Sequence, residues 1–392
     1  MRDHFLPFSP PLIGDEEINE VVATLRVGWI TTGPKVKRFE EEFASFVGSP
    51  AALALNSGTG ALHVALATLG IGPGDAVITT PMTFCSTVHT VEQVGARPVL
   101  VDVEPDTLNI DPNKIEDVLK LKAQNSKLKI KSLLPVHLYG HPCNMDSIMA
   151  IAEKYNLRVI EDAAHALPAK YRGRSVGTIG DLTAFSFYAT KNLTTGEGGM
   201  LTGPADVLRK ARIWSLHGMS QDAWGRYTDE GSWYYEVVCP GFKYNMTDIQ
   251  ASIGIHQLRK LSTFHTRRRE IVERYNQVFS RLGELQTPIE QPGVEHAWHL
   301  YVIHLNLDHL EISRNQFIEE LKKRNIGTSV HFIPVHMHPY YRDKYGYKPE
   351  DFPIAYREYQ RILSLPIYPK MTDQDVEDVI EAVGEVVHHF HC

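Results

Sequence analysis

Short apolar runs alternate with longer segments of helical pattern between residues 50 and 205. A short apolar run next to turn residues predicts a buried strand, whereas apolar residues spaced three or four apart predict a helix. Strands are expected at 51–55, 76–80, 97–103, 133–138 and 158–161, and helices at 59–69, 85–95 and 147–155. Repeated units of this kind predict an α/β fold with helices on both faces of a mostly parallel sheet.

The pattern changes in the second half of the chain, where residues 247–282 are compatible with a helix almost throughout. This length is unusual for one globular helix, so we expect a bent or broken helix that leads out of the first domain. Further strands are expected at 300–305 and 328–331, and further helices at 313–324 and 373–387. Because 392 residues exceed one ordinary core, we predict a large domain over 1–264 and a smaller C-terminal α+β domain over 265–392.

Composition and charge narrow the class of protein. A formal charge of −7 disfavours binding to nucleic acid, whose phosphates require a basic face. The four cysteines show neither a metal-binding spacing nor a disulfide framework, which fits a reducing compartment. The chain has no signal-peptide pattern at residues 1–5 and no apolar stretch long enough to span a bilayer. We therefore expect a cytoplasmic protein with no membrane partner.

Two segments follow predicted strands at the edge where open α/β sheets bind ligands. In Asn56-Ser57-Gly58-Thr59-Gly60, glycines and the amides of a helix N-terminus suit an anion, although for this segment alone an ordinary helix cap with a glycine turn is the preferred explanation. In Glu161-Asp162-Ala163-Ala164-His165, a carboxylate could keep the pyridine nitrogen of a cofactor protonated. The alternatives there are an acid that caps the next loop and a packed histidine.

A third segment carries a lysine, Lys191, between the aromatic residues 185–188 and the glycine-rich turn 196–199. A partly desolvated lysine loses its proton more readily and becomes a nucleophile for an aldehyde, whereas most lysines are simply exposed. The three segments together offer a phosphate cradle, an acid for a pyridinium and an amine for an aldehyde. That combination is what pyridoxal phosphate (PLP) requires.

These segments resemble the DegT/DnrJ/StrS family of sugar aminotransferases, which are fold-type I PLP enzymes. The resemblance extends over almost the whole chain, and further matching segments occur in order at 28–35, 81–84, 241–248, 296–300 and 331–336. It implies that Lys191 holds PLP as a Schiff base and moves the proton, while Asp162 pairs with the pyridinium. His165 would contact the ring hydroxyl, and Phe84 would stack on the ring. Three further groups would hold the phosphate, namely Thr59, the Gly60 amide and Ser186.

The same resemblance implies a homodimer with shared active sites. The family's usual Gly-Tyr-Asn-Tyr-Arg-Met segment is altered here, because Lys243 replaces its asparagine and Asn245 its arginine. A similar version occurs in the branch that resembles UDP-4-amino-4-deoxy-arabinose aminotransferase. Lys243 and Asn245 would lie near the partner's cofactor phosphate or the sugar diphosphate, unless Lys243 is only a loop lysine. Trp29, Thr31 and His331 match segments that border the nucleotide-sugar pocket, or are packing and turn residues.

The resemblance predicts transfer of an amino group from L-glutamate to a 4-keto nucleotide sugar, with a UDP sugar as the leading substrate. The 4-amino sugar would serve cell-surface polysaccharide or lipid modification. One alternative is a PLP-dependent sugar dehydratase, although such relatives carry histidine at the position of Lys191. Another is a regulatory relative without activity. The histidines at 331, 336 and 338 lack a clear carboxylate or thiolate partner, so no metal site is predicted.

Overall fold

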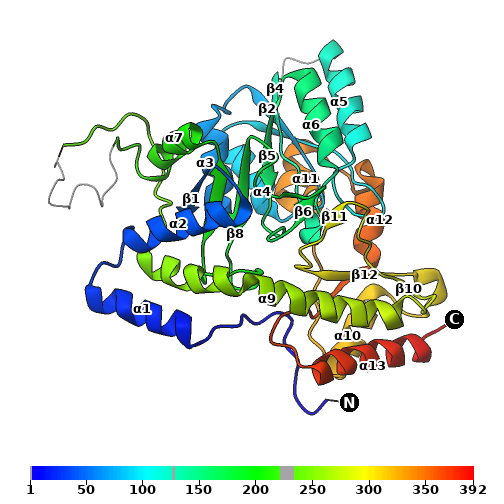
Figure 1. Ribbon diagram of the computed structural model, residues 1–392. Coiled ribbons are helices and arrows are strands. Elements are labelled where there is room, and N and C mark those ends of the chain that lie inside the picture. Colours follow the sequence, from blue (N-terminus) through cyan, green and yellow to red (C-terminus); the bar gives the residue numbers. More distant parts are fainter. Residues whose placement is uncertain (1, 126–128, 221–233) are drawn as a thin grey trace.

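The computed structural model describes residues 2–125, 129–220 and 234–392 (Figure 1). A seven-stranded sheet forms its centre. Its strands lie in the order β1 (Ala51–Leu55), β9 (Gly199–Gly203), β8 (Leu182–Ser186), β5 (Arg158–Asp162), β4 (Lys129–Leu133), β2 (Asp75–Thr79) and β3 (Arg97–Leu100). Within this sheet β9 runs antiparallel to both of its neighbours, and the pairs from β8 to β3 are parallel. The predicted α/β fold with a mostly parallel sheet is confirmed.

Helices cover both faces of the sheet because its strand residues are apolar on both sides. On one face, α3 (Gly58–Thr68), α4 (Cys85–Gln93) and α7 (Ala205–Ser215) pack over side chains such as Ile160. Val159, which precedes Ile160 in β5, points to the other face. Helices α5 (Pro112–Asn125) and α6 (Met145–Tyr155) cover that face. On that second face, α2 (Pro34–Val47) packs Phe43 against Phe185 of β8. Successive side chains of a strand therefore pack against the helices on opposite faces of the sheet.

The long helical segment is one continuous helix, α9 (Asp248–Phe279), of 32 residues. It begins at a capping box between Thr247 and Gln250. Its first half packs on α1 (Asp15–Val27) and α2, and its last residues enter a second apolar core. Figure 1 shows α9 running beneath the sheet and on to the C-terminal elements. The helix is not broken, because apolar partners are available along its whole length.

The second core gathers residues from Ile271 onward, together with Leu6 from the N-terminal segment. Around it lie a small antiparallel sheet and two helices: β10 (Leu285–Gln286), β12 (Tyr301–Leu305), β13 (Ile362–Leu365), α10 (Arg314–Lys323) and α13 (Asp373–His389). Further strands and α-helices in the described part of the chain are β6 (Lys170–Tyr171), β7 (Arg174–Ser175), β11 (Val294–Glu295), α11 (Pro339–Tyr345) and α12 (Pro353–Arg361). The division of the chain into two domains at residue 265 stays a prediction.

Two strand predictions were wrong. Residues 328–331 form no strand, and Ser329 alone exchanges backbone hydrogen bonds with Ser364 of β13. The third strand of the small sheet is instead β13, which directly follows α12. The strand expected at 133–138 is β4, which ends at Leu133, and beyond it only Val136 forms an isolated parallel bridge with Asp162. No helix in the described part of the chain is long and apolar enough to cross a membrane.

Candidate active site

A cavity of about 500 Å³ lies at the sheet edge where β1, β5 and β8 end. This edge is the usual ligand site of open α/β sheets. Loops that follow the strands supply most of its wall, and the segments around 299 and 331 close it. The lining residues are Ser57, Gly58, Thr59, Leu62, Thr83, Phe84, Ser86, Val136, Asp162, Ala164, His165, Ala184, Ser186, Tyr188, Thr190, Lys191, Glu197, His299, His331 and Phe332.

Lys191 lies in the loop after β8, and its side chain lines the cavity. The protein around the amine excludes water, and this desolvation lowers the pKa of Lys191 to about 8, although the charge of Asp162 acts in the opposite direction. A lysine with such a pKa is partly neutral near pH 7, as a nucleophilic amine must be. The structure thus places this amine and the Asp162 carboxylate in one cavity.

Asn192 anchors the loop that carries Lys191. Its Nδ2 donates to the carbonyl oxygens of Leu167 at 2.9 Å and Ala297 at 2.8 Å. Its Oδ1 must therefore accept from His299 Nδ1, at 3.2 Å. Neither Asn192 nor His299 was predicted from the sequence to have a role. In the sequence, the only indication that these two residues matter is their position inside segments 186–199 and 296–300.

Asp162 is the last residue of β5, and both of its carboxylate oxygens are occupied. Thr87 Oγ1 donates to Oδ2 at 2.8 Å, and the Ala164 amide donates to Oδ1 at 3.1 Å. Burial raises the pKa of Asp162, while these two donors and the nearby Lys191 act to lower it. Thr87 was not predicted from the sequence, because nothing in residues 81–90 indicates which strand end its hydroxyl would face.

The adjacent acid, Glu161, points to the opposite face of the sheet and does not line the cavity. Its Oε2 lies 2.9 Å from His137 Nε2, and its Oε1 accepts from the Gly180 amide and the Thr183 hydroxyl, both at 2.7 Å. Burial raises the pKa of Glu161, but the hydrogen bonds led by His137 outweigh it and leave the pKa lowered. Glu161 is therefore a buried structural anion, and Asp162 is the acid of the cavity.

His165 presents an imidazole with a defined tautomer. The Tyr139 amide donates to its Nδ1 at 3.2 Å, so the proton of the neutral ring lies on Nε2. Burial holds the pKa of His165 well below its usual value, and the charge of Lys191 adds to this effect. Its ring is stacked on Phe332, with centroids 5.8 Å apart. His165 thus offers a neutral N–H donor beside the lysine.

The turn between β1 and α3 forms the anion-binding part of the cavity. Ser57 caps α3 by accepting the Gly60 amide at 3.0 Å, so that amide is already in use. The amides of Gly58 and Thr59, at the first two helical positions, have no acceptor within the helix. A Cβ on Gly58 would come within 2.9 Å of Ser186 Cβ, so glycine permits the close approach of this turn to β8. The hydroxyls of Thr59 and Ser186 line the same cavity.

Gly60 does not line this cavity, and neither do the predicted binding residues Trp29, Thr31, Lys243 and Asn245 of the same chain. Lys243 Nζ donates to Asn245 Oδ1, and Asn245 Nδ2 donates to Thr32 Oγ1 at 2.6 Å. The Thr31 carbonyl accepts the Asp248 amide at 3.0 Å, and Trp29 Nε1 donates to the Thr32 carbonyl at 3.0 Å. These residues therefore form a separate cluster, whereas Phe84 and His331 line the cavity as predicted.

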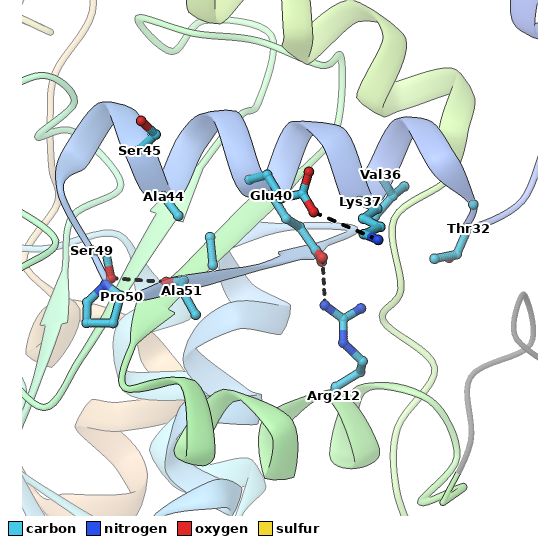
Figure 2. A pocket seen from close by; sticks show the side chains of 13 residues that line it. Thr32, Val36, Lys37, Glu40, Ala44, Ser45, Ser49, Pro50, Ala51 and Arg212 are labelled. Carbon is cyan, nitrogen blue, oxygen red and sulfur yellow. Dashed lines mark hydrogen bonds and ion pairs between the residues drawn. The ribbon is translucent and has the colours of Figure 1, made fainter.

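Thr32 also borders a second cavity, of about 590 Å³, between α2 and α7 beside the edge strand β1. Figure 2 shows Arg212 pointing toward Glu40, and their side chains form an ion pair at 2.6 Å. The other oxygen of Glu40 accepts the Ala54 amide at 2.8 Å, so this carboxylate covers a backbone donor of β1. Such capping protects an edge strand from further pairing.

Pyridoxal phosphate suits the first cavity, since its aldehyde takes an amine, its ring nitrogen a carboxylate, and its phosphate a helix N-terminus. No group of three or more potential metal ligands occurs among the described residues. Comparison with known proteins defines the reaction as well as the cofactor: the chain is a PLP-dependent aminotransferase. It belongs to the DegT/DnrJ/EryC1/StrS aminotransferase family, whose model matches residues 11–384.

Relatives cover nearly the whole chain. The spore coat polysaccharide biosynthesis protein SpsC of Bacillus subtilis is 54% identical over 388 residues, which are 98% of each chain. Spr1654 of Streptococcus pneumoniae, described as a candidate sugar aminotransferase, is 36% identical in its PMP form, with a TM-score of 0.90 over 98% of this chain and 99% of its own. DesV of S. venezuelae, solved with a ketimine intermediate, is 31% identical, with a TM-score of 0.86 over 97% and 99%.

Proposed function

We propose that this enzyme moves an amino group from L-glutamate to a 4-keto nucleotide sugar, with a UDP sugar as the leading substrate. The product is a 4-amino sugar used for cell-surface polysaccharide or lipid modification. The observation that carries the proposal is the shared cavity of Lys191 and Asp162 in a member of a sugar aminotransferase family. The name of SpsC, which refers to coat polysaccharide, supports the proposed use of the product.

In this proposal PLP supplies the electron sink that stabilises a carbanion, and the protein supplies orientation and proton transfer. Lys191 would hold the cofactor and carry the proton to and from the reacting carbon. Asp162 would keep the ring nitrogen protonated, and His165 would donate a hydrogen bond from Nε2 to the ring hydroxyl. Phe84 would pack on the ring, and His331 would border the sugar. The phosphate would be held by the hydroxyls of Thr59 and Ser186 and by the free amides of Gly58 and Thr59 at the helix N-terminus.

The test is a panel of UDP-, dTDP- and GDP-linked 4-keto sugars, each incubated with ¹⁵N-labelled L-glutamate. The expected result is a UDP sugar in which the labelled nitrogen replaces the keto oxygen, detected by mass spectrometry. Enzyme with Lys191→Ala serves as the blank. A product that has lost oxygen without gaining nitrogen would instead establish dehydration, and no product from any sugar would exclude this substrate class.

We further propose that the active enzyme is a homodimer with shared sites. Among the described residues that line the cavity, Lys191 is the single lysine or arginine, too few for a cofactor phosphate and a sugar diphosphate. Phe84 at the cavity is 57% exposed, and Ile18 and Leu25 of α1 are 52% and 53% exposed. Large apolar side chains in such positions are suited to burial against a second copy. Lys243, Asn245, Trp29 and Thr31 would then complete the partner's cavity.

Subunit complementation tests the shared site directly. Lys191→Ala and Lys243→Ala enzymes should each be inactive or weak alone, whereas a mixed dimer regains one site that contains both lysines. We expect roughly a quarter of wild-type activity after equal subunits are mixed and exchanged at random, because half of the dimers are mixed and each has one intact site of two. Lys37→Ala, at an exposed lysine of α2, is the matched control for Lys243. Mixtures no more active than their components would contradict the proposal.

A further inference from the structure

Two buried threonine hydroxyls form a chain that ends on Asp162. Thr87 Oγ1, in the first turn of α4, lies 2.8 Å from Asp162 Oδ2 and 2.7 Å from Thr83 Oγ1. Thr83 is 2% exposed and Thr87 is fully buried. Both hydroxyls are therefore shielded from water and linked by hydrogen bonds to one carboxylate. Burying a hydroxyl costs free energy unless it has a hydrogen-bond partner.

The direction of this chain follows from the chemistry of its members. An ionised carboxylate only accepts hydrogen bonds, so the single hydroxyl proton of Thr87 points to Asp162. The bond between the two threonines must then use the proton of Thr83. Donation therefore runs from Thr83 to Thr87 to Asp162, and each bond strengthens the next by polarisation.

Thr87 differs in this respect from the other buried threonine of α4. The hydroxyl of Thr90 donates to the Thr87 carbonyl at 3.1 Å, which is the local bond that threonine usually makes within a helix. Thr87 instead directs its hydroxyl across the layer to β5. Both side chains are fully buried, so they differ in hydrogen bonding and not in burial.

A proton between a carboxylate and a pyridine nitrogen lies on the more basic of the two groups. Burial alone favours the neutral acid, which would draw the proton toward Asp162 and leave the ring uncharged. A hydrogen bond donated to the carboxylate favours its ionised form and lowers its affinity for the proton. We propose that Thr87 is a positioning residue that, through Asp162, keeps the shared proton on the ring nitrogen of PLP. This inference rests on the role proposed above for Asp162.

The experiment compares Thr87→Val, which removes the hydroxyl and keeps the side-chain shape, with Thr90→Val as the matched control. Each enzyme is loaded with PLP labelled with ¹⁵N at the ring nitrogen, and the ¹⁵N signal is followed from pH 6 to 9. We expect a protonated nitrogen in the wild type and in Thr90→Val, and a partly or fully unprotonated one in Thr87→Val. The first half-reaction with L-glutamate should slow by about 10- to 100-fold in Thr87→Val, in line with loss of one hydrogen bond to a charged group.

Two more variants guard against a general loss of structure. Thr87→Ser retains the donor and should restore both the nitrogen signal and the rate, and Thr83→Val should shift the signal in the same direction by a smaller amount. A Thr87→Val enzyme with the same nitrogen signal as Thr90→Val would overturn the proposal. An unprotonated nitrogen in the wild type would overturn it together with the role of Asp162. Neither readout requires a sugar substrate, so an error about the sugar would leave these results unaffected.

Discussion

Replacing Lys191 with alanine abolishes transamination and the visible absorbance of the lysine-bound cofactor, while the fold persists. The amine is the nucleophile for the aldehyde and the group that moves the proton, and no other described lysine lines the cavity. We expect a loss of at least roughly 10⁴-fold in kcat, as is typical when a nucleophile is removed. The measurements are product formation, absorbance of the PLP-loaded protein, and far-ultraviolet circular dichroism.

Lys170→Ala provides the control for this experiment, because Lys170 is a lysine of the same fold whose amine pairs with Glu295 at the surface. It should retain wild-type absorbance and turnover, since exposed ion pairs contribute little. Near-wild-type transamination by Lys191→Ala, with a properly folded Lys170→Ala enzyme alongside, would refute the role of Lys191.

Asp162→Asn should lower kcat by roughly 10³-fold, because an amide of the same size cannot hold a positive charge on the ring nitrogen. The variant should still bind PLP through Lys191. Since the charge of Asp162 raises the pKa of Lys191, its removal should move that pKa below the present value of about 8. The rate is measured in single turnovers with L-glutamate, and the amine is titrated in PLP-free protein by the pH dependence of PLP capture.

Glu161→Gln separates this effect from damage to the sheet. Glu161 immediately precedes Asp162 in the chain and points to the other face of the sheet. It accepts hydrogen bonds from His137, Gly180 and Thr183. Its substitution should lower the melting temperature and leave the single-turnover rate close to that of the wild type. The assignment would fail if Glu161→Gln lost the rate while Asp162→Asn kept it.

The sequence alone was sufficient for the parts of the fold that short-range patterns define. Strands and helices of the central sheet alternate as expected because each apolar run is bounded by turn residues, as at Ala51–Leu55 and Gly58–Thr68. The failures occur where a partner distant in sequence decides the structure. Ser329 reaches β13 through a single bridge, so the segment around it never becomes a strand.

The candidate site shows the same difference between residues that short-range patterns identify and residues whose partners are distant in sequence. Lys191 and Asp162 could be identified because each residue type follows a strand within a motif of its own. Thr87 and Asn192 could not, because their importance depends on a carboxylate 75 residues away and on carbonyls up to 105 residues away. The resemblance assigned Asp162 and not Glu161 to the ring nitrogen, and strand geometry gives the physical reason, because the two acids point to opposite faces.

The unbroken helix α9 restricts how this enzyme can admit its ligands. Its Asp248 accepts the Lys35 and Val36 amides at the start of α2, and twenty residues later Arg268 is fully buried and donates to the carbonyls of Trp298, His299 and Ile367. At 1.5 Å per residue the helix is a rod of about 48 Å that is fastened on both sides of residue 265. A hinge at that residue would have to break this helix, so we expect ligand entry to depend on the side chains and loops around the cavity.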